Sequence, residues 1–145
     1  MGLVLVVDDE ADVRASLRRV IEKYGHEVVE AASADEALAA METRAADVVF
    51  TDIQMPGHDG RWLTFELRKR YPATAVVLAT SVTDLEAEIT LKFGVLSYLV
   101  KPFDLPAIGR ALKTALDWHA ENVAAGHRAV DERQLEEWLN SLEVL

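Results

Sequence analysis

The 145-residue chain contains no cysteine, which excludes a disulfide framework and a zinc site built from thiolates. It has no apolar run long enough to cross a membrane, and the apolar stretch near the amino terminus is too short for a signal peptide. Basic residues are few, 15 against 25 acidic ones, and the net charge is −10. Arg14, Arg18 and Arg19, and residues 68–70, are interpreted as the solvated faces of helices. We therefore expect a soluble cytoplasmic protein with no membrane partner and no direct nucleic-acid partner.

Half of the residues are apolar, which is enough to build the core of one domain. Apolar runs of strand length alternate with longer amphipathic segments, which is typical of a parallel sheet with covering helices. We predict strands at residues 3–7, 27–31, 47–51, 75–79 and 97–100, and helices at 10–24, 34–44, 60–71, 84–93 and 104–120. Ser33 with Glu36 and Thr83 with Glu86 fit capping boxes.

The predicted fold class is α/β, with a doubly wound five-stranded parallel sheet and helices on both faces over residues 1–120. The 27–31 segment is more polar than the other strands and is expected at an edge of the sheet. Residues 121–145 form a helical extension that is too small to be a domain. We interpret it as a linker to an output domain absent from this chain, or as a docking or dimerisation helix.

Polar residues follow four of the apolar runs, at the point where each predicted strand ends. They are Asp8 and Asp9, then Asp52, then Thr80, and then Lys101. Ligands of open parallel sheets bind outside these strand ends, so we expect the residues to form one site. Three carboxylates in one cleft require positive charge, which Lys101 and a Mg²⁺ ion would supply. A carboxylate in this setting can attack phosphorus and form an aspartyl phosphate, with the Thr80 hydroxyl donating a hydrogen bond to it.

The ordered set of these segments resembles a response-regulator receiver domain of two-component signalling, the CheY-like family, over residues 3–120. The segments that carry the resemblance are Val7-Asp8-Asp9-Glu10, Asp52-Ile53-Gln54-Met55-Pro56-Gly57-His58-Asp59-Gly60, Leu78-Ala79-Thr80-Ser81 and Tyr98-Leu99-Val100-Lys101-Pro102-Phe103. The resemblance implies the flavodoxin-like receiver fold.

The resemblance also implies roles for the residues at the strand ends. Asp52 would be the phosphoacceptor, and Lys101 would pair with the phosphoryl group. Mg²⁺ would be bound directly by Asp9, Asp52 and the main-chain carbonyl of Gln54, and through a water molecule by Asp8. A sensor histidine kinase would be the phosphoryl donor, and an output domain or a downstream protein would receive the signal.

Further implications concern the switch that follows phosphorylation. Thr80 and Tyr98 would move together and change the surface of the fourth helix, fifth strand and fifth helix. A homodimer would form through that surface or through the C-terminal helix. The Lys101–Pro102 peptide bond would be cis. Val82 is apolar where many receivers place a polar side chain, which predicts slow self-dephosphorylation.

Two other functions remain open from the sequence. A haloacid-type phosphatase also uses an aspartate nucleophile with Mg²⁺ and a lysine, although its aspartates usually follow the first strand in an Asp-x-Asp pattern. Here the first strand is followed by adjacent aspartates, Asp8 and Asp9. The other alternative is a degenerate receiver that only binds protein partners. The presence of all five site residues argues against it.

Overall fold

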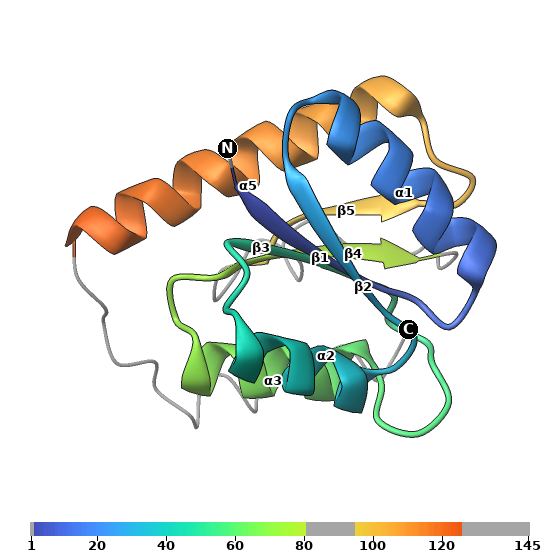
Figure 1. Cartoon of the computed structure of the whole chain (residues 1–145), viewed down its shortest axis with the longest axis horizontal. Helices are drawn as coiled ribbons and strands as arrows, with labels where there is room; N and C mark the ends of the chain where they lie inside the picture. The colour runs from blue at the N-terminus through green and yellow to red at the C-terminus, as the bar shows by residue number, and fades with distance from the viewer. Residues whose placement is uncertain (1, 81–94, 126–145) are drawn as a thin grey trace.

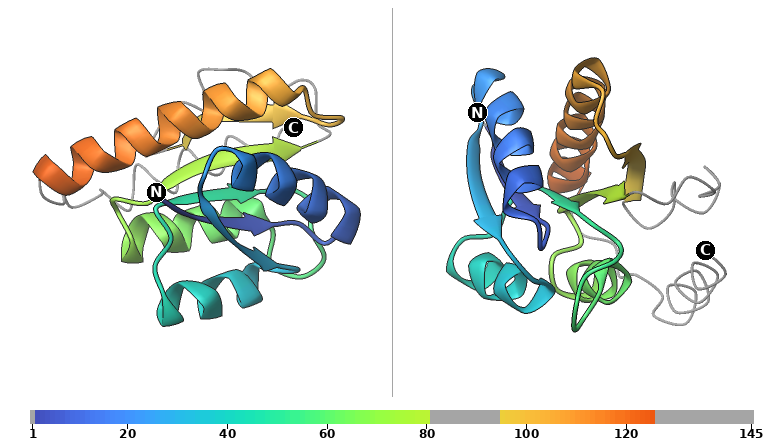
Figure 2. Two further views of the ribbon diagram at one scale, coloured as in Figure 1. Left: turned by 45° about the horizontal axis from the view of Figure 1, so that its top comes forward. Right: turned by 90° about the vertical axis from the view of Figure 1, so that its right-hand side faces the viewer.

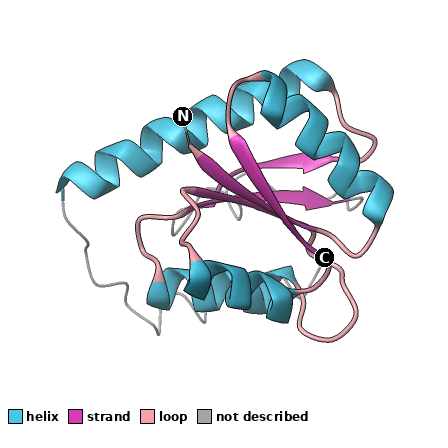
Figure 3. Cartoon of the chain, viewed as in Figure 1, coloured by secondary structure: helices cyan, strands magenta, loops and turns pink. Residues whose placement is uncertain are grey.

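The computed structural model describes residues 2–80 and 95–125, without the side chains of residues 80, 95–98 and 125. Strands and helices alternate from β1 to β4, and β5 and α5 come after residues 81–94, which are not described (Figures 1 and 3). The strands are β1 (Leu3–Val7), β2 (Glu27–Ala31), β3 (Val48–Thr51), β4 (Ala75–Thr80) and β5 (Val95–Val100). The helices are α1 (Ala11–Lys23), α2 (Ala34–Thr43), α3 (Gly60–Arg70) and α5 (Leu105–Ala125).

All five strands pair in parallel, in the order β2-β1-β3-β4-β5. The predicted α/β fold class is confirmed, and β2 lies at an edge as its polar composition indicated. The chain passes from β1 outward to β2 and then returns across β1 to β3. The direction of winding therefore reverses between β1 and β3, which is where ligands bind in sheets of this kind.

Helices cover both faces of the sheet: α1 and α5 lie on one face, and α2 and α3 lie on the other (Figures 1 and 2). Alternate residues of β1 point to opposite faces, with Leu3, Leu5 and Val7 toward α2 and α3, and Val4 and Val6 toward α1 and α5. Both sets are buried, which explains why the strand is apolar throughout.

Most predicted elements lie within one or two residues of their observed bounds, but α5 is longer than expected. It continues to Ala125, so the segment assigned to the extension begins inside this helix. No glycine or proline interrupts residues 121–125, and the Asn122 side chain donates to the Trp118 carbonyl at 2.8 Å. Among the residues described, no helix is both long and apolar enough to cross a bilayer.

The start of α2 confirms its predicted cap, because Ser33 Oγ accepts a hydrogen bond from the Glu36 amide at 3.1 Å. The Thr83–Glu86 capping box and the helix at 84–93 lie outside the described residues. Leu17, Ile21 and Tyr24 are spaced by four and three residues, as on one face of a helix, but Leu17 and Ile21 are buried whereas Tyr24, the C-cap of α1, is 56% exposed. The apolar period predicts the buried face only within the helix.

Arg68 corrects the interpretation of the basic groups as solvated. Its side chain is among the largest fully buried ones, and it donates to the carbonyls of Pro72 at 3.1 Å and of Thr74. The guanidinium carbon lies 5.7 Å from the centre of the Trp118 ring. Arg68 therefore joins the α3–β4 loop to α5.

Candidate functional site

Asp52 directly follows β3 and is almost fully buried at 6% exposure. Its amide donates to the Val7 carbonyl at 3.0 Å, and its carboxylate accepts a hydrogen bond from the Gln54 amide at 3.3 Å. The other carboxylate oxygen lies 3.0 Å from Lys101 Nζ. Burial raises the pKa of Asp52, and the hydrogen bond from Lys101 offsets part of that rise.

Lys101 joins two strand ends by contacting two carboxylates at once. Its Nζ lies 2.8 Å from Asp8 Oδ2 and 3.0 Å from Asp52 Oδ2. Burial by itself would lower the pKa of Lys101, but the hydrogen bonds with Asp8 and Asp52 outweigh it and leave that pKa raised. The peptide bond from Lys101 to Pro102 is cis. The structure thus places Asp8, Asp52 and Lys101 together.

The residues after β1 form a compact acidic group of Asp8, Asp9 and Glu10, with ligand oxygens that lie within 4.8 Å of one another. Asp8 is buried, whereas Asp9 and Glu10 are exposed to solvent. Such a set suits a hard divalent cation that keeps part of its hydration shell. Glu10 is not among the site residues predicted from the sequence, although it directly follows Asp9.

The loop from β3 to α3 is shaped by its glycines. Gly57 has a φ of +77°, a conformation that side chains with a Cβ rarely adopt. A Cβ on Gly60 would collide with the carbonyl oxygen of Asp52. Asp59 caps α3 by accepting from the amides of Arg61 and Trp62, each at 3.0 Å. The start of α3 is therefore packed directly against the backbone of Asp52.

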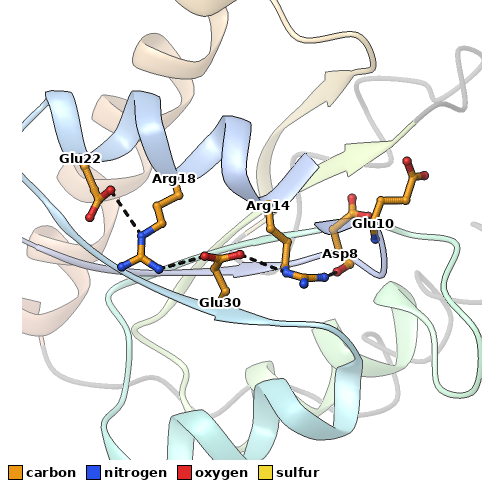
Figure 4. Close-up of polar contacts among 6 residues, drawn as sticks. All are labelled: Asp8, Glu10, Arg14, Arg18, Glu22 and Glu30. Atoms are coloured by element: carbon orange, nitrogen blue, oxygen red, sulfur yellow. Dashed lines mark hydrogen bonds and ion pairs between the residues drawn. The ribbon is translucent and has the colours of Figure 1, made fainter. Parts of the chain in front are cut away.

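A chain of polar contacts supports the acidic group from the side of β2 (Figure 4). Arg14 donates to the Asp8 carbonyl at 2.6 Å and to Glu30 at 3.2 Å. Arg18 donates to the other oxygen of Glu30 at 2.9 Å and lies 3.4 Å from Glu22. Arg14 is only 17% exposed beside Glu30 of the neighbouring strand, so its interpretation as part of a solvated face is wrong, whereas Arg18 is 42% exposed and Arg19 is exposed as predicted.

Thr80 and Tyr98 are placed by their backbones. Thr80 ends β4 and pairs with Val100, so it lies at the carboxyl ends of the strands, next to the position of Lys101. Tyr98 pairs with Leu78 within the sheet. The Thr80 hydroxyl and the Tyr98 ring lie outside the description, and so does Val82, on which the prediction of slow self-dephosphorylation rests.

Comparison with known proteins identifies the family. A family model described as the response regulator receiver domain matches residues 4–113. The chain belongs to this family. The receiver shares 33% identity over 121 residues with the DNA-binding transcriptional regulator NtrC of Salmonella typhimurium, an alignment that covers 83% of this chain and 26% of NtrC. The chain thus spans about a quarter of that relative's length.

Solved structures agree with the family assignment. The receiver domain of NtrX from Brucella abortus is 35% identical with a TM-score of 0.73, and the match covers 79% of this chain and 98% of that one. The chemotaxis protein CheY4 of Vibrio cholerae is 30% identical with a TM-score of 0.73, and the match covers 80% and 99%. The recognition made from the sequence is confirmed: this is a receiver domain of response regulators, a signalling module.

Proposed function

We propose that the chain accepts a phosphoryl group on Asp52 from a phosphohistidine of a sensor histidine kinase. A carboxylate oxygen of Asp52 attacks phosphorus while the phosphorus–nitrogen bond of the donor breaks, and the donor imidazole is released. The observation that supports this most directly is the contact of Lys101 with Asp52 at 3.0 Å. The ammonium group lies where it can neutralise the oxygens of an incoming phosphoryl group.

The acidic group fits the Mg²⁺ that the family implies. Asp9, Asp52 and the Gln54 carbonyl would bind the ion directly. Asp8 would act through water, because its Oδ1 already accepts from the Glu10 amide at 2.9 Å and its Oδ2 contacts Lys101. Mg²⁺ held there would supply positive charge for the phosphoryl oxygens.

The signal would leave through the side of the sheet that carries β5 and α5. In this proposal Thr80 and Tyr98 are the switch residues, and the signal passes to an output domain or a downstream protein. Val100 on β5 and Val123 on α5 are exposed apolar residues. They suit a surface that pairs with a partner or with a second copy of the chain. Because the donor kinase would use ATP, we propose that the chain meets it in the cytoplasm.

The test is phosphorylation by acetyl phosphate in the presence of Mg²⁺, followed by intact-mass measurement. We expect a gain of one phosphoryl group that is labile in base and absent from Asp52→Asn. The matched control is Asp104→Asn, which alters an exposed carboxylate near Lys101 and leaves the gain intact. A gain that persists in Asp52→Asn would reject Asp52 as the acceptor.

The same experiment separates the two alternatives left by the sequence. A haloacid-type phosphatase would hydrolyse phosphate esters over many turnovers, whereas a receiver takes up one phosphoryl group per chain. A degenerate receiver would show no gain of mass. Membership of the receiver family and the Asp8–Lys101–Asp52 contacts favour the phosphoacceptor.

A further inference from the structure

The loop that carries the acidic group is tied to the fold through Asp8. The Asp8 amide donates to the Ala31 carbonyl of β2 at 3.2 Å, and its carboxylate contacts the Glu10 amide and Lys101. Its carbonyl oxygen accepts from the Arg14 guanidinium at 2.6 Å. Asp8 is 1% exposed, so this carbonyl has little access to water and depends on Arg14 for its hydrogen bond.

Arg14 is in turn fixed by Glu30, which lies on the edge strand β2 opposite Val6 of β1. Glu30 accepts from Arg14 Nε with one carboxylate oxygen and from Arg18 with the other, as Figure 4 shows. The hydrogen bond from Arg18, followed by that from Arg14, lowers the pKa of Glu30. The Arg14 side chain is 17% exposed, so the guanidinium is held between a strand and the loop.

We propose that Arg14 and Glu30 are positioning residues that set the geometry of the loop carrying Asp8 and Asp9, the two residues that β1 contributes to the Mg²⁺ site. The inference rests on the proposed function, because it assigns the acidic group to a divalent cation. Neither residue needs to touch the ion. Glu30 orients Arg14, Arg14 fixes the Asp8 carbonyl, and the backbone carries that constraint to the next residue, the exposed ligand Asp9.

The positive charge of Arg14 and its hydrogen bond to the Asp8 loop predict opposite effects on Mg²⁺ affinity when Arg14 is replaced. A cation beside the acidic group repels Mg²⁺, so its field alone would make Arg14→Gln bind Mg²⁺ more tightly. If Arg14 instead acts by holding the Asp8 loop in place, the same variant should bind Mg²⁺ more weakly. Arg14→Lys keeps the charge but not the planar fork that reaches Glu30 and Asp8 together, so it isolates the effect of position.

The experiment titrates Mg²⁺ into the full chain stripped with EDTA and follows binding by calorimetry. We expect Arg14→Lys and Arg14→Gln each to weaken Mg²⁺ binding by roughly tenfold, as is usual for residues that support metal ligands. Glu30→Gln should weaken it in the same direction. The matched control is Arg18→Lys, one turn along α1, which loses a contact with Glu30 but does not reach Asp8.

Amide hydrogen exchange of the metal-free protein gives a second readout. The amides of Asp9 and Glu10 should exchange faster in Arg14→Lys than in the wild type, while those of β3 are unchanged. Tighter Mg²⁺ binding by Arg14→Gln, or unchanged binding by Arg14→Lys, would overturn the positioning role. If the wild type itself neither binds Mg²⁺ nor gains a phosphoryl group, the proposed function fails instead.

Discussion

Replacing Asp52 with asparagine should stabilise the metal-free protein at neutral pH. The Asp52 side chain is 8% exposed, and a second buried carboxylate, Asp8, shares its ammonium partner Lys101. Burial raises the pKa of Asp52 above its ordinary value. A carboxyl with a raised folded-state pKa favours folding less and less as the pH rises through that pKa, so the ionised form weakens the fold.

The contact distances set the size of the effect. With an effective dielectric constant of about 20, Lys101 at 3.0 Å attracts Asp52 by roughly 5–6 kcal/mol. The Oδ2 atoms of Asp8 and Asp52 lie at most about 5.8 Å apart, the sum of their distances to Lys101 Nζ, and therefore repel by at least about 3 kcal/mol. The remaining attraction is smaller than the several kcal/mol of desolvation. We expect Asp52→Asn to raise the free energy of unfolding by about 1–2 kcal/mol.

The assay is thermal and urea unfolding in EDTA, followed by circular dichroism. At pH 7 the melting temperature of Asp52→Asn should exceed that of the wild type by roughly 3–6 °C. The difference should shrink as the pH falls through the raised pKa of the wild-type carboxyl, because the protonated form carries no desolvation penalty for a charge. Asp117→Asn is the control, because this exposed carboxylate pairs with Lys113 and should change stability by less than about 0.5 kcal/mol. A variant less stable than the wild type at pH 7 would refute the reasoning.

Three further substitutions test the packing around the site by urea unfolding. Gly60→Ala should lower the free energy of unfolding by about 1–3 kcal/mol, because the added Cβ collides with the Asp52 carbonyl, and backbone atoms cannot move aside as a flexible side chain can. An unchanged urea midpoint would contradict that contact. Arg68→Met should cost about 2–3 kcal/mol, since it leaves buried carbonyls without their donor; a neutral result would mean that water replaces the guanidinium. His58→Ala should cost about 1 kcal/mol by removing the ring whose centre lies 3.7 Å from that of Trp62, whereas His58→Phe keeps the stack and should be nearly neutral. Equal losses would assign the effect to the hydrogen bond between His58 and Asp35.

The sheet was predictable because each strand carries its own signal. Leu3–Val7 is apolar at every position since both of its faces are buried, and Glu27–Ala31 is more polar since it lies at the edge. Helix ends were less predictable. The periodicity of α5 weakens after Trp118, but the backbone is helical through Ala125, and residues 119–125 contain no glycine or proline.

The supporting contacts of the site were not predictable in the same way. Asp52 and Lys101 stand out because a charged residue directly after an apolar strand is uncommon. Arg14 and Glu30 have no comparable sequence signal, since a basic residue on a helix and an acidic residue on an edge strand are both ordinary surface features. Their contact depends on how α1 lies against β2, which is a tertiary property (Figure 4).

Lys101 gives a physical route from Asp52 to the surface formed by β5 and α5. It follows β5 directly, and the Asp104 carbonyl three residues later accepts from the Ile108 amide in the first turn of α5. We infer that a phosphoryl group on Asp52 would compete with Asp8 for the Lys101 ammonium, because it adds charge and acceptor oxygens beside it. Ile108 is buried in the core, so a displacement of Lys101 would have to be absorbed by the short segment 102–104 or passed to α5. We therefore expect residues 102–104 to be where a change at Asp52 first alters the shape of the surface.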